Sequence, residues 1–154
     1  MNISVSSSAS LSWLLPLSLS EWEKALELML DFLPARENPA GGREAATLEL
    51  ALLDDADMAE LNLRHLGCPG PTNVLSFQAS PPALGWLAIS VESIRREAGI
   101  YGEDPAFYAL RMLAHGLAHL RGHSHGPEME RLSGAAALSV LESFTIQGRL
   151  PCLS

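Results

Sequence analysis

The chain has 154 residues, of which 47% are hydrophobic; this gives room for one domain with one core and excludes a disordered or fibrous chain. The formal net charge is -8, with ten lysines and arginines. This charge excludes a protein that coats nucleic acid by bulk electrostatics, because neutralising phosphates requires many basic side chains. A function on nucleic acid would therefore need a local basic patch or a metal ion.

The sequence predicts a cytoplasmic protein with free thiols. Cys68 and Cys152 have no CxxC spacing, so we expect them to be reduced. The apolar run at residues 11–19 is interrupted by Pro16, has no basic region before it and is followed by no A-x-A site, so it does not read as a secretion signal. No stretch approaches the ~18 apolar residues of a membrane span, so we expect no membrane association.

The first half of the chain predicts two strands and two helices. Apolar and polar residues alternate at 2–6 and at 47–54, which is the period of a strand. A helix is expected over 20–33, capped by Ser18 or Ser20 and ended by Pro34. One face of that helix is apolar, and it is formed by Trp22, Ala25, Leu26, Met29 and Leu33.

A second helix is expected over 55–66, capped by Asp54 and Asp55 and stopped before the breaker cluster at 67–71. The segments 72–79 and 86–91 are rich in β-branched and aromatic residues and predict two further strands.

The last third of the chain predicts three helices. The first covers 91–100, the second opens with Asp104 as N-cap and Pro105 at its first position, and the third runs from Pro127 to about Phe144. The loop composition at 37–44 gives no linker long enough to divide domains. The prediction is a single compact α+β domain over residues 1–154, with about four strands and about five helices.

Four of the five histidines lie between residues 115 and 125, in the stretch HGLAHLRGHSH. His115 and His119 are four apart in a predicted helix, so their imidazoles share one face. Gly122 can take the positive φ that turns the chain back after the helix, which makes His123 and His125 the candidates for a third ligand. Three histidines leave an open coordination position, which is typical of a catalytic zinc site.

The spacing favours His125 as the third ligand, because metzincin proteases use the same spacing in HExxHxxGxxH. We interpret His123 as a solvated neighbour or as a residue that supports a ligand. The general-base glutamate of the protease pattern falls on Gly116, so ordinary zinc peptidase chemistry is not expected.

Two motifs and a connecting segment resemble the YbeY family of bacterial metal-dependent endoribonucleases, which act in ribosomal RNA maturation. HGLAHLRGHSH is similar to the family signature HGxLHLxGYDH. LNLRHLGCPGPTNVLSF, at 61–77, is similar to LNxxYRxxDxPTDVLSF, and LGWLAIS is similar to LGDIxIS. The resemblance covers nearly the whole chain and implies a mixed four-stranded sheet with helices.

By this resemblance His115, His119 and His125 hold one divalent transition metal, with zinc expected first. The ion would lower the pKa of a bound water toward ~7 and polarise a phosphoryl oxygen. The implied activity is zinc-dependent endoribonuclease cleavage of single-stranded or ribosomal RNA, in rRNA maturation and ribosome quality control.

The chain departs from the family pattern around these ligands. The signature's Tyr-Asp is His123-Ser124, and two family aspartates fall on Trp86 and Pro69. The family arginine, a cation suited to the developing charge of a phosphodiester, falls on Leu66.

Nearby residues offer partial substitutes. Arg64 would substitute for the family arginine at position 66 only if this segment were extended, because residues 64 and 66 then share a face. In the predicted helix, Arg64 points away from that face. Asn73 is an uncharged stand-in for an aspartate, and we expect it, with Thr72 and Ser76, to serve strand packing and hydrogen bonding. We interpret Arg95, Arg96, Arg111 and Arg121 as a solvated helix surface rather than a basic patch.

Two alternatives stay open, and no catalytic residue is assigned beyond the metal ligands. A catalytically weakened or inactive family member would act as a metal-stabilised protein that binds ribosomal components or another partner. Alternatively, the metal would assist hydrolysis of a different substrate. The sequence carries no indication of oligomeric state.

Overall fold

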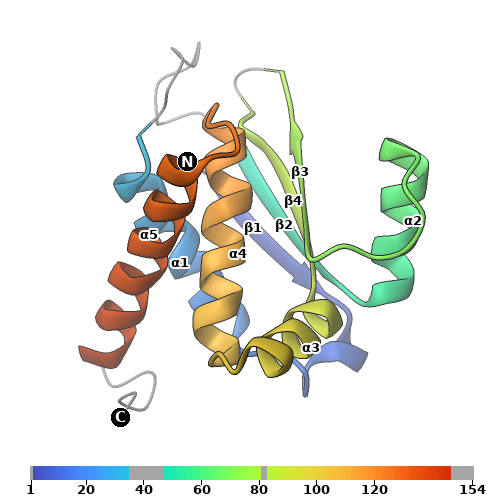
Figure 1. The fold of residues 1–154 in the computed structure, drawn as a ribbon, viewed down its shortest axis with the longest axis horizontal. Coiled ribbons are helices and arrows are strands. Elements are labelled where there is room, and N and C mark those ends of the chain that lie inside the picture. Colours follow the sequence, from blue (N-terminus) through green and yellow to red (C-terminus); the bar gives the residue numbers. More distant parts are fainter. Residues whose placement is uncertain (1, 35–46, 81–82, 147–154) are drawn as a thin grey trace.

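The computed structural model describes residues 2–34, 47–80 and 83–146. Within these ranges the chain forms a four-stranded sheet and five α-helices (Figure 1). The elements are β1 Asn2–Ser7, α1 Leu19–Phe32, β2 Thr47–Leu53, α2 Asp55–Leu66, β3 Val74–Gln78, β4 Gly85–Ser90, α3 Val91–Tyr101, α4 Pro105–Leu120 and α5 Pro127–Ile146, with a short 3-10 turn at Ala9–Leu11. The predicted α+β class is confirmed; the predicted loop at 37–44 and Cys152 lie outside the described residues.

The sheet has the strand order β1-β2-β4-β3. β1, β2 and β4 are parallel, whereas β3 pairs antiparallel with β4, so the sheet is mixed, as the family resemblance implied. The register places Leu50 opposite Leu87 and Leu87 opposite Ser76. Because side chains alternate along strands, these three residues point to the same face of the sheet.

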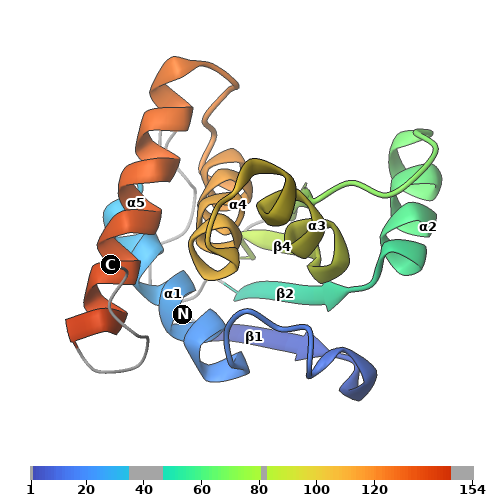
Figure 2. The same cartoon turned by 60° about the horizontal axis from the view of Figure 1, so that its bottom comes forward.

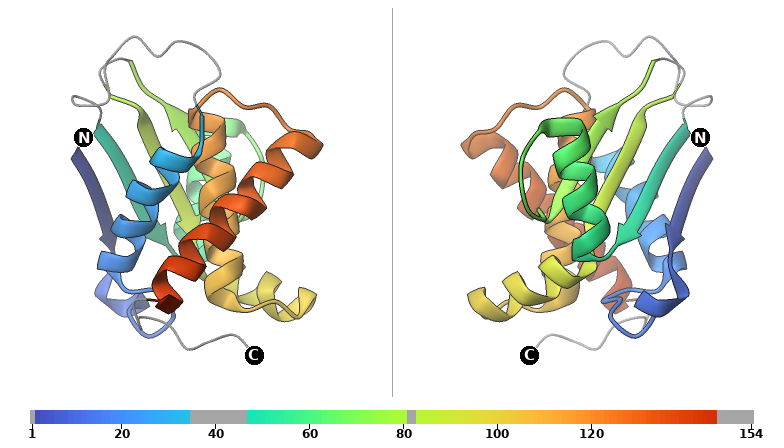
Figure 3. Two further views of the ribbon diagram at one scale, coloured as in Figure 1. Left: turned by 90° about the vertical axis from the view of Figure 1, so that its left-hand side faces the viewer. Right: turned by 90° about the vertical axis from the view of Figure 1, so that its right-hand side faces the viewer.

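Helices α1 and α4 cover that face, α5 packs on these two helices, and α2 lies against the other face (Figure 3). The main core lies under α1, α4 and α5 and includes Trp22, Met29, Leu50, Leu87 and Phe144, all nearly or fully buried. A smaller apolar cluster under α2 contains Met58, Leu75 and Ala88. Figure 2 shows α3 crossing the end of the sheet beside α4.

Side-chain caps set the helix starts. Ser18 caps α1 in a reciprocal capping box with Glu21, which decides between Ser18 and Ser20. The apolar face predicted for this helix is buried, including Leu33 just beyond its end. Asp54 caps α2 and Asp104 caps α4, with Pro105 following as expected.

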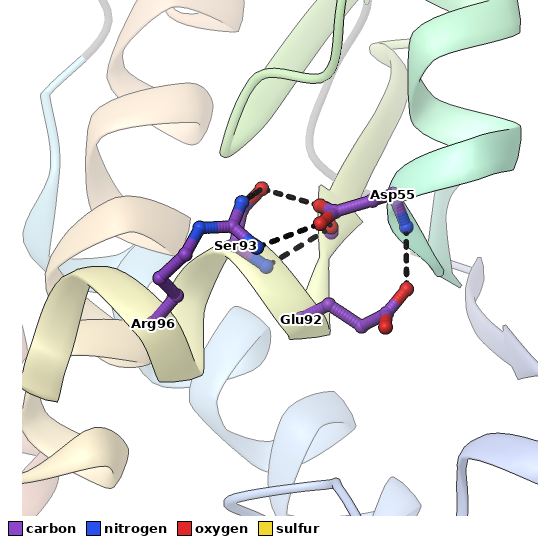
Figure 4. A network of polar contacts seen from close by, with 5 residues as sticks. Asp55, Glu92, Ser93 and Arg96 are labelled. Atoms are coloured by element: carbon purple, nitrogen blue, oxygen red, sulfur yellow. Dashed lines mark hydrogen bonds and ion pairs between the residues drawn. The ribbon is translucent and has the colours of Figure 1, made fainter.

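A polar network ties the start of α2 to the start of α3 (Figure 4). Asp55 does not cap its own helix; its carboxylate accepts hydrogen bonds from Ser90 at 2.7 Å, Ser93 at 2.6 Å and Arg96 at 2.8 Å. Its backbone N–H donates to Glu92 at 2.8 Å. Sequence reasoning did not foresee this network, because its members lie far apart in the chain.

No helix in the described ranges combines the length and the apolar character that crossing a membrane requires.

Candidate metal centre and the cleft beside it

Helix α4 carries two of the three candidate ligands. Its packing face, including Leu113 and Leu117, is fully buried against the sheet side of the core. His115 and His119 are only partly buried, and their ring centroids are 4.9 Å apart. The i, i+4 spacing thus places both imidazoles together on the helix, as predicted.

The turn after α4 brings His125 to the same place. Gly122 has φ 89°, and its N–H donates to the carbonyl of His119 at 3.0 Å, so the positive φ expected there is confirmed. The ring of His125 lies 5.3 Å from that of His115 and 4.4 Å from that of His119. One nitrogen from each of the three lies within 4.8 Å of the others, so this cluster could hold a metal ion.

The protonation state of the cluster suits a metal. Burial, followed by the positive charges that His119 and His125 would carry, lowers the pKa of His115, with Glu130 opposing. Burial also lowers the pKa of His119, with His125 adding to the effect and a hydrogen bond to the His123 backbone opposing it. Both imidazoles are therefore neutral at pH 7, which is the form that ligates metals.

His123 is not solvated, so that part of its interpretation was wrong. It is 6% exposed, and its Nε2 hydrogen-bonds to the carbonyl oxygen of Pro34 at 2.8 Å. The turn contributes to this, because the N–H of His123 donates back to the carbonyl of Ala118 at 3.0 Å and so holds the His123 backbone against the end of α4. The residue that replaces the family tyrosine therefore anchors the turn.

Gly116, at the position of the catalytic glutamate of zinc proteases, lies in a crowded contact with β3 and β4. A Cβ at this position would lie 2.8 Å from Val74 Cγ2 and 3.1 Å from Leu87 Cδ2, so a larger side chain would require these neighbours to shift. The Gly116 carbonyl also accepts a hydrogen bond from Ser76 Oγ at 2.9 Å. This position belongs to the contact of α4 with β3, so a glutamate here would disturb the packing of the two elements.

Two of the residues that depart from the family pattern, Leu66 and Trp86, lie on α2 and on β4. Leu66 ends α2 and is 57% exposed. Arg64 points to solvent and pairs with Glu60, as expected for a helical segment. Trp86 stacks on Phe77 with ring centroids 4.0 Å apart, so it packs where the family has an aspartate.

Asn73 and His115 line the same cleft. Its Nδ2 donates to Glu97 Oε2 at 3.1 Å and to Met112 Sδ at 3.4 Å. Glu97 also accepts a 2.5 Å hydrogen bond from Tyr108, and burial followed by this bond raises the Tyr108 pKa. The hydrogen-bonding role expected for Asn73 is confirmed, as is that of Ser76.

A cleft of about 700 Å³ adjoins the histidine cluster between α4 and α5. Arg111 and His115 line it from α4, and Glu130, Arg131 and Ser133 line it from α5. The sequence did not indicate Arg131 and Ser133 as neighbours of the histidines. Arg111 could have been predicted to lie near His115, because it precedes His115 by four residues on the same helix.

The four arginines interpreted as a solvated surface are all engaged. Arg95 donates to the Leu14 carbonyl at 2.7 Å and Arg121 to that of Leu30 at 2.8 Å. Arg96 pairs with Asp55 and Arg111 with Glu103. The interpretation holds for Arg96, which is 52% exposed, and was wrong for the partly buried Arg95, Arg111 and Arg121, whose helix surfaces pack against other segments.

The fold and the site define an α+β protein in which a cluster of three histidines adjoins a cleft. Residues 12–135 match the family model described as Endoribonuclease YbeY. The chain therefore belongs to the YbeY family, and the resemblance seen in its motifs is confirmed.

Curated relatives agree with this assignment. The chain is 40% identical over 143 residues to Endoribonuclease YbeY of Oleidesulfovibrio alaskensis, covering 77% of this chain and 80% of that protein. It is 36% identical over 156 residues to Endoribonuclease YbeY of Nitratidesulfovibrio vulgaris, covering 87% and 91%. A Thermotoga maritima protein solved in solution matches the fold with a TM-score of 0.60 at 18% identity, over 95% of this chain and 92% of that one.

Proposed function

We propose that this protein is a zinc-dependent endoribonuclease that cleaves single-stranded RNA during ribosomal RNA maturation and ribosome quality control in the cytoplasm. The observation that carries the proposal is the meeting of His115, His119 and His125 in a family whose curated members are named endoribonucleases. The function is assigned to one domain spanning residues 1–154, with ribosomal components as partners.

In this proposal the three histidines supply neutral nitrogen ligands, and Gly122 makes the turn that brings the third. Zinc, or another divalent ion that prefers imidazole, would activate water and polarise a phosphoryl oxygen when bound. No carboxylate general base is available at Gly116, because that backbone packs against β3. The protein's own contribution to catalysis is therefore the placement of the ligands and of the RNA beside them.

A second candidate function comes from Leu66. The arginine expected of the family is replaced there by an exposed leucine, which cannot stabilise a developing negative charge. A family member without this cation would retain its metal and fold and act by binding ribosomal components or a partner protein.

One experiment separates the two. The purified protein is analysed for zinc and assayed on single-stranded RNA with and without a chelator, beside His119→Ala and a control, His65→Ala, which changes a histidine outside the cluster. We expect cleavage that is lost with chelator and in His119→Ala but retained in His65→Ala. Bound zinc without cleavage would favour the binding function, and cleavage that survives both treatments would exclude a metal nuclease.

Leu66→Arg tests the missing cation. The substitution lies on an exposed position at the end of α2, so it should not disturb folding. Activity that rises above wild type would show that the cation was lost from a working site. Unchanged activity would show that residue 66 is not the deficit.

A further inference from the structure

The cleft beside His115 has a cation on each wall. Arg111, His115 and His119 follow each other at intervals of four residues on α4, so Arg111 lies one turn, about 6 Å, before His115 along the helix. Arg131 lines the opposite wall from α5, in the face that also carries Pro127 and Gly134. The two arginines therefore border the space next to the candidate metal.

Arg111 is held in place with donors to spare. Its Nη2 pairs with Glu103 Oε1 at 3.0 Å, and its guanidinium carbon lies 5.3 Å from the ring centroid of Tyr108. These contacts fix the plane of the guanidinium, while its remaining N–H groups have no partner among the described residues. A fixed guanidinium with unused donors suits a phosphate, which accepts two parallel hydrogen bonds.

Arg131 is exposed and forms no ion pair or hydrogen bond within the described ranges. The hydroxyl of Ser133, on the same wall, is buried and also lacks a partner there. Of the polar groups that α5 contributes to this wall, the exposed guanidinium of Arg131 is therefore the one free to bind an anionic ligand.

The size and lining of the cleft suit a nucleotide. A volume of about 700 Å³ falls in the range of small-ligand sites and exceeds what a lone phosphate fills. Phe107, Met112 and Pro127 contribute apolar lining for a base or ribose. Glu130 is the acidic residue of the lining, and Glu103 is paired to Arg111, so the arginines are the groups able to attract an anion.

We infer that this cleft is the RNA-binding subsite of the protein, in which Arg131 and Arg111 contact the backbone phosphate next to the metal centre and supply the cation that Leu66 lacks. The inference rests on the proposed nuclease function and deepens it. On this inference the protein can bind RNA although position 66 is a leucine, because the cations that contact phosphate lie on α4 and α5 rather than on α2.

The test measures RNA binding rather than cleavage. A labelled single-stranded phosphorothioate RNA that resists cleavage is titrated with the zinc-loaded protein at several salt concentrations. Arg131→Gln is compared with Arg64→Gln, a matched control that removes the same charge from an exposed helix across the sheet. Arg131→Lys retains the charge, and Arg111→Gln is accepted only if its melting temperature matches that of wild type.

We expect Arg131→Gln to weaken binding about tenfold, the range of one charge-assisted contact. The slope of log affinity against log salt should fall by about 0.7, as for one lost phosphate contact on a single strand. Arg131→Lys should recover most of the affinity, and Arg64→Gln should bind as wild type does.

Two results would overturn the inference, and only the second would also overturn the proposed nuclease function. If wild type binds and cleaves RNA while Arg131→Gln and Arg64→Gln bind equally well, the subsite is wrong and the metal nuclease stands. If wild type neither binds nor cleaves single-stranded RNA, the proposed function and the subsite fail together.

Discussion

The histidine cluster and the Asp55 network are both polar clusters at helix ends, but they differ in how their members are satisfied. The Asp55 carboxylate faces three donors, Ser90, Ser93 and Arg96, at 2.6 to 2.8 Å. The three histidines instead face one another, and burial together with the charge of the neighbouring histidines lowers the pKa of His115 and of His119. A cluster whose donors and acceptors hydrogen-bond to one another stabilises the fold. A cluster of like groups is stabilised when all of its members bind one ligand, such as a metal ion.

The two clusters also lie at opposite ends of the sheet. α3 and the start of α2 are at the lower end of the molecule in Figure 1, and the turn between α4 and α5 is at the upper end. Because distant sites contribute independently to stability, perturbing one cluster should leave the other unaffected.

The largest expected effect is that of zinc on stability. Zinc at about 100 times its dissociation constant should raise the free energy of unfolding by about 2.7 kcal/mol. Urea unfolding with and without zinc measures this increment. The increment should vanish in His119→Ala and persist in His65→Ala; an equal increment in both variants would mean that zinc binds elsewhere.

Asp55→Ala should cost about 2 kcal/mol, because Ser90 and Ser93 lose their acceptor in a buried setting and Arg96 loses its partner. Urea unfolding again provides the measurement. The zinc increment should be the same in this variant as in wild type. A change in that increment would show that the two clusters are coupled.

The contribution of Asp55 should depend on pH. Burial raises its pKa, but hydrogen bonds from Arg96, Ser93 and Ser90 outweigh burial and lower the pKa below the ordinary 3.8. A lowered carboxylate pKa gives stability that is present above pH 3.8 and is lost as pH falls through the folded-state value. The difference in unfolding free energy between wild type and Asp55→Asn should therefore be constant above about pH 5 and shrink below pH 3.8. A difference that grows with acid would have the wrong sign.

The smallest expected effect is that of Arg96→Gln. Arg96 is 52% exposed, and exposed ion pairs contribute less than about 1 kcal/mol. Thermal unfolding beside Arg64→Gln, which breaks another exposed pair, measures the difference. A loss as large as that of Asp55→Ala would mean that the arginine, not the serines, holds the network.

The same contrast explains how far the sequence could be read. The histidine cluster lies within eleven residues, and helix periodicity with one glycine turn brings its three members together. The Asp55 network joins residues 35 to 41 positions apart, and only the packing of α2 against α3 decides that they meet. The capped helices and alternating strands were readable because their signals are local.

The cleft was predictable from the sequence only in part. Arg111 was visible as one turn before His115, but its meaning depends on Arg131 from α5, and no spacing predicts how two helices face each other. His123 was misread for the same reason, since its partner is the carbonyl of Pro34. Residues that act across helices therefore required the structure.

Zinc content per chain tests the central claim most directly. Wild type and single alanine variants of His115, His119, His125 and His65 are dialysed against zinc and analysed for bound metal, with circular dichroism to confirm folding. The three-histidine centre predicts one zinc per chain in wild type and in His65→Ala, and loss of zinc in each of the other three variants. Wild type without zinc, or folded variants of the cluster that retain a full equivalent, would contradict it.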